Sequence, residues 1–184
     1  MNMQEDSRSP ATIKQRFGEI EQNPIGLPDN YTKQIIQQMN TDLASQFTMF
    51  FQFKKQHWTV DGPDWKHIQA ALDEYAKTTL EATEDLAERI NLLGGVPISN
   101  PSRFQELSYV SFEGEDKIDV RTMLENDLKA KQQAIQQLRK RIQFVKENQD
   151  QGSDEILKDI LEDDESIAHE LHHYLKNESL EASL

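Results

Sequence analysis

Apolar residues recur at three- and four-residue steps through most of this chain, which is the spacing of one face of an α-helix. The first such segment covers about residues 31–58 and is ended by Gly62-Pro63. The second covers about residues 64–93 and stops at Gly94-Gly95, with Pro97 beyond it. The pattern therefore predicts two long helices in the first half of the chain.

A longer connection separates these helices from the next. Residues 96–118 lack a sustained helical pattern, although Pro101 suits the first turn of a short helix over residues 101–107. A third long helix is predicted from about residue 119 to 148, with Val120 and Leu124 among its first apolar positions.

The fourth helix has the most regular apolar stripe of the chain. Gly152 predicts the turn before it, and Ser153 or Asp154 can cap its first turn. Its apolar positions are Ile156, Leu157, Ile160, Leu161, Ile167, Ala168, Leu171 and Leu175.

Together these segments predict an all-α fold, because no stretch alternates as a β-strand does. Four long helices with one long connection between the second and third describe a ferritin-like four-helix bundle. The connection must cross the length of the bundle if those two helices run the same way. We expect a flexible N-terminal tail over residues 1–29, the bundle over 30–176, and a short C-terminal tail over 177–184.

Composition narrows the function classes. The net charge of −13 argues against DNA binding and suits a protein that attracts cations, although an acidic surface also simply maintains solubility. The chain has no cysteine, which excludes disulfides, thiolate zinc sites and cysteine nucleophiles. No secretory signal or bilayer-spanning apolar run is present, so we expect a soluble cytoplasmic protein.

Acidic residues at helical spacing mark the second helix. Glu84 and Glu88 are one turn apart, and Asp73 shares their face. Asp73 nevertheless lies about 16 Å from Glu84 along the axis at 1.5 Å per residue, whereas a metal bond is about 2 Å long. Either these acids serve different purposes, or two antiparallel copies of the helix bring Asp73 of one beside Glu84 and Glu88 of the other. A solvated acidic face is the simpler alternative.

The residues from His57 onward resemble the signature of the Dps-type miniferritins, the family of DNA-binding proteins from starved cells. The likeness covers about residues 31–176, and the chain's ending is most similar to cyanobacterial and haloarchaeal members. The matching segments are His57-Trp58-Thr59-Val60-Asp61-Gly62, Asp73, Ala87-Glu88-Arg89-Ile90, Leu93-Gly94-Gly95-Val96-Pro97, and Ala168-His169-Glu170-Leu171-His172-His173-Tyr174-Leu175.

The resemblance implies a hollow dodecamer that oxidises Fe(II) with hydrogen peroxide or dioxygen and stores ferric mineral. Its ferroxidase centres would lie between two-fold-related subunits, with one or two iron ions each, and Zn could substitute for iron. By position, His57 and Asp73 would come from one subunit, and Glu84 and the bridging Glu88 from its neighbour. Trp58 would pack beside the centre.

Two positions depart from the family pattern. Gln69 stands where the family usually has a second histidine, and Glu84 where many members have aspartate. His67 is two residues from Gln69 and so points to another face. The loss of an imidazole weakens one iron position, so the centre could hold a single metal tightly, react slowly or recruit another ligand.

The fourth helix offers further ligands. His169 and His173 are one turn apart, His172 lies nearer the core edge, and Glu170 with His173 has the Glu-x-x-His spacing of di-iron bundles. Only one such pair occurs, so the internal site of the larger ferritins is not supported. His173 is our first choice for an added ligand, with a surface histidine cluster as the alternative.

The acidic start of the same helix suits the three-fold iron-entry pores that the family implies, with Asp154 and Asp159 as pore residues or merely a solvated face. Two other functions remain open. Gln69 suggests a metal-binding shell with slow or no ferroxidation, and some relatives compact DNA, although the acidic charge predicts that this chain does not.

Overall fold

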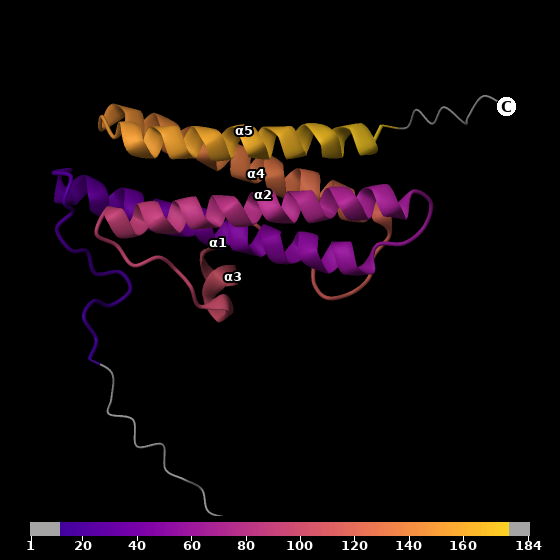
Figure 1. Ribbon diagram of the computed structural model, residues 1–184, viewed down its shortest axis with the longest axis horizontal. Helices are drawn as coiled ribbons and strands as arrows, with labels where there is room; N and C mark the ends of the chain where they lie inside the picture. The colour runs from indigo at the N-terminus through magenta and orange to yellow at the C-terminus, as the bar shows by residue number, and fades with distance from the viewer. Residues whose placement is uncertain (1–11, 177–184) are drawn as a thin grey trace, which may run out of the picture.

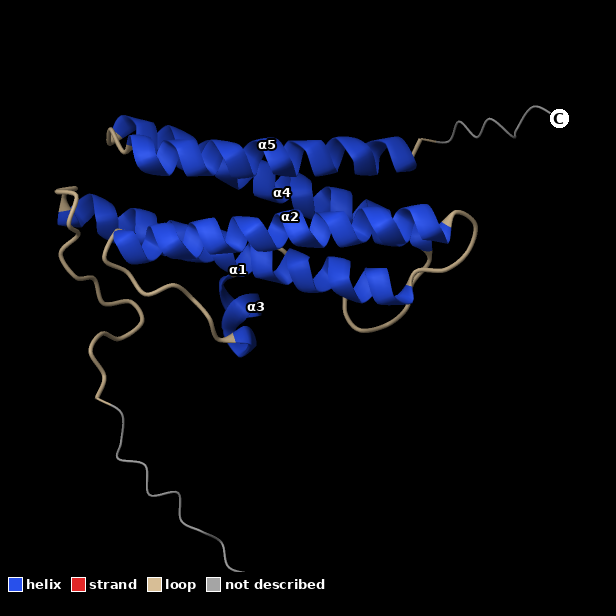
Figure 2. Cartoon of the chain, viewed as in Figure 1, coloured by secondary structure: helices blue, strands red, loops and turns tan. Residues whose placement is uncertain are grey.

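The computed structural model describes residues 12–176, which form a bundle of four long helices (Figure 1). Within those residues all regular structure is helical, which confirms the predicted all-α bundle (Figure 2). No helix among them is long and apolar enough to span a bilayer. The long helices are α1 (Asp29–Thr59), α2 (Trp65–Leu92), α4 (Val120–Glu147) and α5 (Gln151–Tyr174).

The helices pair as α1 with α2 and α4 with α5, and α2 and α4 run in the same direction (Figure 1). The connection between α2 and α4 therefore returns along the outside of α1, as the pattern required. It contains the 3₁₀ turn η1 (Pro101–Arg103) and the short helix α3 (Phe104–Leu107). Asn100 caps this turn by accepting a hydrogen bond from the Ser102 backbone N–H at 3.1 Å.

The start of α5 differs from the prediction. Gly152 lies inside the first turn, and the cap is Asp150, whose carboxylate accepts the Ser153 N–H at 3.0 Å. The chain reverses one residue earlier, at Gln149, which has a φ of 58°. The predicted turn at Gly152 and caps at Ser153 or Asp154 are therefore wrong. Asp150 is held in the cap position by tertiary contacts with Arg89 and Tyr31 that spacing alone does not reveal.

Two apolar clusters fill the bundle, one towards each end. Leu43, Leu86 and Leu157 are fully buried in the first, and Phe53 and Leu72 lie in the second. The clusters supply most of the burial that stabilises the fold, at about 25 cal/mol per Å² of apolar surface.

A buried polar layer joins the four helices between these clusters. Asp164 of α5 accepts hydrogen bonds from Lys131 of α4 at 2.5 Å and from Gln46 of α1 at 3.1 Å. The Lys131 ammonium also donates to the Thr79 hydroxyl of α2 at 3.2 Å. Each of the four helices thus contributes one polar side chain to the layer.

The described part of the predicted N-terminal tail lies against the end of α2. The Glu21 N–H and the Gln15 side-chain amide both donate to the Gly94 carbonyl, at 2.9 and 2.8 Å. Gly94 has a φ of 92°, and a Cβ there would stand 2.1 Å from the Glu21 carbonyl oxygen. Residues 1–11 and 177–184 lie outside the described residues, so the division into tails and bundle stays a prediction.

Candidate metal centre

Glu84 and Glu88 are exposed on α2, and neither has a hydrogen bond or ion pair within residues 12–176. Arg89 is adjacent to Glu88 in sequence but turns inwards, where its guanidinium contacts Asp150 at 2.5 Å. Glu88 is therefore not paired with Arg89 or with another basic residue within the described chain. Both carboxylates are available to an incoming cation.

Asp73, unlike Glu84 and Glu88, is paired with two lysines. Its two carboxylate oxygens contact the Lys54 ammonium at 2.9 Å and the Lys77 ammonium at 3.1 Å. Hydrogen bonds from Lys54 and then from Lys77 lower the pKa of Asp73 to about 2. Neither of these ion pairs was predicted from the sequence. The spacing of four residues to Lys77 could have shown one of them, whereas Lys54 comes from another helix.

His57 lies at the last turn of α1 with a fixed ring orientation. Its Nδ1 is 2.9 Å from the Gln69 carbonyl oxygen, which can only accept, so Nδ1 carries the proton. Nε2 then presents a lone pair, as in histidines that bind metal through Nε2. The Gln69 side chain donates in return to the His57 carbonyl at 3.1 Å. Gln69 therefore orients His57 instead of extending the ligand set.

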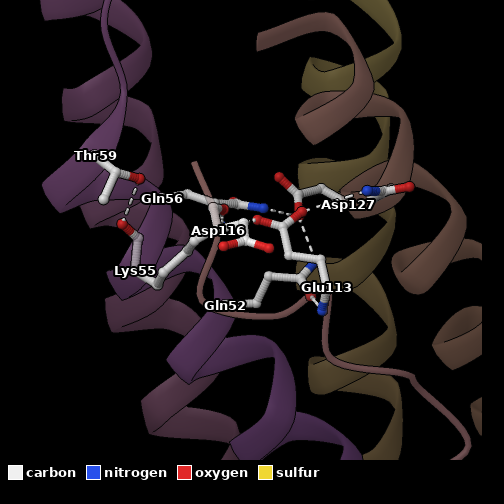
Figure 3. A network of polar contacts seen from close by, with 8 residues as sticks. Gln52, Lys55, Gln56, Thr59, Glu113, Asp116 and Asp127 are labelled. Carbon is white, nitrogen blue, oxygen red and sulfur yellow. Dashed lines mark hydrogen bonds and ion pairs between the residues drawn. The ribbon is translucent and has the colours of Figure 1, made fainter. Parts of the chain in front are cut away.

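A network of polar contacts fixes the last two turns of α1 (Figure 3). The amides of Gln52 and Gln56 donate to one oxygen of Asp127 on α4, at 2.7 and 2.9 Å. Lys55 contacts Glu113 of the crossover at 2.9 Å. Burial raises the pKa of Asp127 to about 7, while the two amide hydrogen bonds oppose the rise. Sequence reasoning missed this network, because its partners lie far apart in the chain.

One chain does not assemble a metal site from these residues. Among residues 12–176 no group of three or more histidines and acids is placed to hold an ion. The pairs His57–Gln69 and Lys54–Asp73 lie on one strip between α1 and α2, whereas Glu84 and Glu88 lie three to four turns further along α2. This placement agrees with the helix arithmetic, which requires a second copy for a shared centre.

His173 does not lie on the strip that carries Asp73. The Glu170 carboxylate accepts the Tyr75 hydroxyl proton at 2.8 Å, so α5 faces the Tyr75 side of α2. Asp73 precedes Tyr75 by two residues and thus points about 200° away around the helix. The charge of Lys176 lowers the pKa of His173 more than burial and the neighbouring histidines do.

The acids predicted to line a pore lie near the start of α5. Asp154 is half-buried and pairs with Lys158 and, at 3.9 Å, with Lys146, whereas Asp159 is exposed. Their role in an iron-entry pore stays a prediction.

The sequence matches the ferritin-like domain family over residues 36–180. It is 32% identical to the DNA protection during starvation protein of Halobacterium salinarum, over 98% of this chain and 96% of that protein. A nutrient stress-induced DNA-binding protein of Synechococcus is 34% identical, over 91% of this chain and 96% of its own length.

The solved structures agree. An archaeal Dps homologue from Halobacterium salinarum superposes with a TM-score of 0.91 at 30% identity, covering 94% of this chain and 97% of that one. This chain is a Dps-type member of the ferritin-like family. DpsC of Streptomyces coelicolor has the same fold, with a TM-score of 0.89, 26% identity, and coverage of 92% and 99% of the two chains.

Membership confirms the resemblance on which the site residues were chosen. A Dps protein of Vibrio cholerae, described as one of the ferritin-like diiron-carboxylate proteins, shares the fold at 22% identity. The structure adds two observations about these residues. The Gln69 carbonyl fixes the orientation of the His57 ring, and lysine ammonium groups contact the Asp73 carboxylate. The roles of His57, Asp73, Glu84, Glu88 and His173 as ligands stay proposals.

Proposed function

We propose that this Dps-type protein is a ferroxidase that oxidises Fe(II) at centres shared by two subunits, stores ferric mineral inside a hollow dodecamer and so protects against hydrogen peroxide. The proposal rests on Glu84 and Glu88, which have no hydrogen bond or ion pair among residues 12–176 and lie several turns from Asp73 on the same helix. A second copy of α2 running antiparallel supplies what one chain lacks. We place this activity in the cytoplasm.

In this arrangement His57 and Asp73 of one subunit face Glu84 and Glu88 of its neighbour. His57 binds Fe(II) through Nε2, because Nδ1 donates to the Gln69 carbonyl. Glu88 of the partner subunit bridges, since a carboxylate has two oxygens for two adjacent cations. A Bacteroides fragilis relative of the same fold, 24% identical, is described as a dodecameric thioferritin, and we extend the dodecameric assembly to this chain.

The reaction needs two electrons for each hydrogen peroxide. Two Fe(II) ions each give one electron, two protons are taken up, and the peroxide leaves as two water molecules. Paired transfer avoids the one-electron step that releases hydroxyl radical. The protein contributes ligands, geometry and enclosure, and the redox chemistry belongs to the metal.

Lys54 and Lys77 compete with Fe(II) for the Asp73 carboxylate. Because their ammonium groups occupy both carboxylate oxygens, an arriving Fe(II) must displace at least one of them. Lys54 is the more enclosed of the two, with 25% of its side chain exposed against 58% for Lys77. Fe(II) binding at Asp73 is therefore weaker than at an unpaired carboxylate.

Anaerobic loading with Fe(II), followed by peroxide in a stopped-flow spectrometer, tests the proposal. We expect a rapid Fe(III) absorbance rise and an assembly of twelve subunits by light scattering. Zn(II) added first should suppress the rise by occupying the same ligands. An Fe(III) signal no larger than that of buffer would instead support a shell that binds metal with slow or no oxidation, which Gln69 in place of a ligand favours.

DNA binding is the second function to consider, since the named relatives are DNA-binding or DNA-protecting proteins. The net charge of −13 opposes contact with phosphates, because such contact depends on clustered Lys and Arg. We therefore expect no gel shift of linear DNA at physiological salt. A clear shift under that condition would contradict this part of the proposal.

A further inference from the structure

The last two turns of α5 carry a pair of histidine rings whose nitrogens converge. His169 and His173 are both exposed, and their Nε2 atoms are 3.1 Å apart. Their ring centroids lie 4.4 Å apart at an interplanar angle of 80°, so the rings do not stack. The two nitrogens therefore lie side by side on one face of the helix.

That separation suits two ligands of one metal ion. Two imidazole nitrogens bound at about 2.0–2.1 Å, with about 95–110° between the bonds, lie about 3.0–3.4 Å apart. Imidazole is a preferred ligand of zinc, copper and nickel. The local sequence His169-Glu170-Leu171-His172-His173 has the H-E-x-x-H spacing, in which two histidines on one helix face bind Zn(II).

We propose that His169 and His173 form a surface site for a divalent transition-metal ion of the zinc or copper class, separate from the iron centre and independent of the proposed ferroxidase function. Water completes the coordination, because the described residues contain no cluster of three ligands. The site is separate because α5 faces the Tyr75 side of α2 and not the Asp73 side.

The spacing does not make this site a peptidase. In a hydrolytic H-E-x-x-H helix the glutamate must act as a general base on metal-bound water. Here one oxygen of Glu170 already accepts the Tyr75 hydroxyl at 2.8 Å. Glu165, one turn before His169, is paired with Arg139 at 2.6 Å. Both carboxylates are thus engaged by other groups of the described chain, so the arrangement favours cation binding over hydrolysis.

The competing explanation is a simple N–H···N hydrogen bond between the two rings. In the hydrogen bond one Nε2 donates its proton to the lone pair of the other, whereas in a metal site both Nε2 atoms are deprotonated and both lone pairs point at the ion. Cu(II) distinguishes them, because its electron paramagnetic resonance spectrum reports how many nitrogens are bound. A metal site gives a two-nitrogen pattern, whereas a hydrogen-bonded pair leaves at most one ring for the metal.

The experiment titrates the full-length, metal-free assembly with Zn(II) against a chromogenic chelator and repeats it with Cu(II) in the spectrometer. Each histidine substitution is made in two parent proteins, the wild type and Glu88→Ala. Zinc bound at the proposed iron centre is then distinguished by its loss in the Glu88→Ala parent. His169→Ala and His173→Ala should each remove one equivalent per chain from both parents, or weaken it at least tenfold. His172→Ala and His67→Ala, which also remove exposed histidines, should leave that equivalent in place.

Three results would overturn the proposal. The first is unchanged zinc stoichiometry and affinity in His173→Ala. The second is a Cu(II) spectrum with one nitrogen in the wild type. The third is an equivalent that disappears in Glu88→Ala and is not reduced further by His173→Ala, since His173 would then belong to the iron centre. These three results do not depend on whether the wild type oxidises Fe(II), so the proposed ferroxidase function is tested separately.

Discussion

Two groups of carboxylates in this protein differ in what surrounds them. Inside the bundle, Asp164 is bound to Lys131, and Asp42 is bound to Arg141 at 3.0 Å. On the surface of α2, Glu84 and Glu88 have no such partner within the described chain. Asp164 and Asp42 are more buried than Glu84 and Glu88, but their negative charges are already balanced by Lys131 and Arg141.

The difference shows where a metal can bind. A buried carboxylate needs a counter-ion or, as at Asp127, a proton, because an unpaired charge in a low-dielectric interior is costly. Lys131 and Arg141 fill that need permanently, so iron would have to displace a covalently attached cation. Exposed carboxylates are solvated by water and give it up more easily. The interior acids therefore stabilise the fold, whereas Glu84 and Glu88 on α2 are the acids for which we propose metal binding.

The largest expected effect comes from removing the interior cation. Lys131→Met leaves Asp164 buried and uncompensated, and we expect it to lower the free energy of unfolding by about 3–5 kcal/mol. Chemical denaturation at a fixed protein concentration measures the loss, because the stability of an oligomer depends on concentration. The double variant Lys131→Met/Asp164→Asn should regain much of it.

A matched control exists between the same two helices. Arg139 and Glu165 also join α4 to α5, but their side chains are 62% and 45% exposed. Arg139→Met should change the free energy of unfolding by less than about 1 kcal/mol. Equal losses from Lys131→Met and Arg139→Met would show that the buried pair has no special structural role.

The next effect concerns the surface acids. Glu88→Ala should slow Fe(II) oxidation more than tenfold, which corresponds to about 1.4 kcal/mol or more in activation free energy, while the assembly remains intact. Stopped-flow absorbance gives the rate and light scattering gives the size. Glu147→Ala is the control, since Glu147 is also an exposed acid, in the last turn of α4. Similar kinetics in both variants would exclude Glu88 from the centre.

A third prediction uses the pH dependence of the interior. Because burial raises the pKa of Asp127 to about 7, the folded state keeps a proton between about pH 4 and 7 that the unfolded chain releases. Asp127 thus lowers stability as pH rises through this window, by up to about 1.4 kcal/mol per pH unit.

Asp127→Asn removes that dependence and still accepts the amide protons of Gln52 and Gln56. The stability difference between variant and wild type should grow in the variant's favour from pH 5 to 7 and level off above. Burial raises the pKa of Asp42 to about 6. In both proteins Asp42 therefore leaves a smaller dependence of the free energy of unfolding on pH. Parallel stability curves across this range would contradict a raised pKa at Asp127.

The smallest effect is expected at Asp73, in the iron centre that we propose. Lys54→Met frees one oxygen of Asp73 and should tighten Zn(II) binding at the centre about two- to fivefold, the range of a partly exposed ion pair. Lys77→Met should do less, because its ammonium is more exposed. Calorimetric titration measures both, with Lys129→Met as a control on α4. Weaker binding in Lys54→Met would mean that the lysine assists the metal.

The sequence by itself determined the helices, the crossover and the choice of acids. Three- and four-residue apolar spacing, the Gly94-Gly95 stop and the positions of Asp73, Glu84 and Glu88 are local properties, and local properties are readable along one chain. The predicted cap of α5 was wrong for a non-local reason. Asp150 is the cap because of its contacts with Tyr31 and Arg89, which lie far away in sequence.

Only the tertiary structure decided which of these acids are neutralised. Lys54 reaches Asp73 and Lys131 reaches Asp164 across helix interfaces, while Arg89 turns from Glu88 towards Asp150. It also fixed the proton on His57 Nδ1 and brought the Nε2 atoms of His169 and His173 together. Charge pairing and ring orientation depend on distances of about 3 Å between separate turns or helices, and residue spacing does not specify such distances.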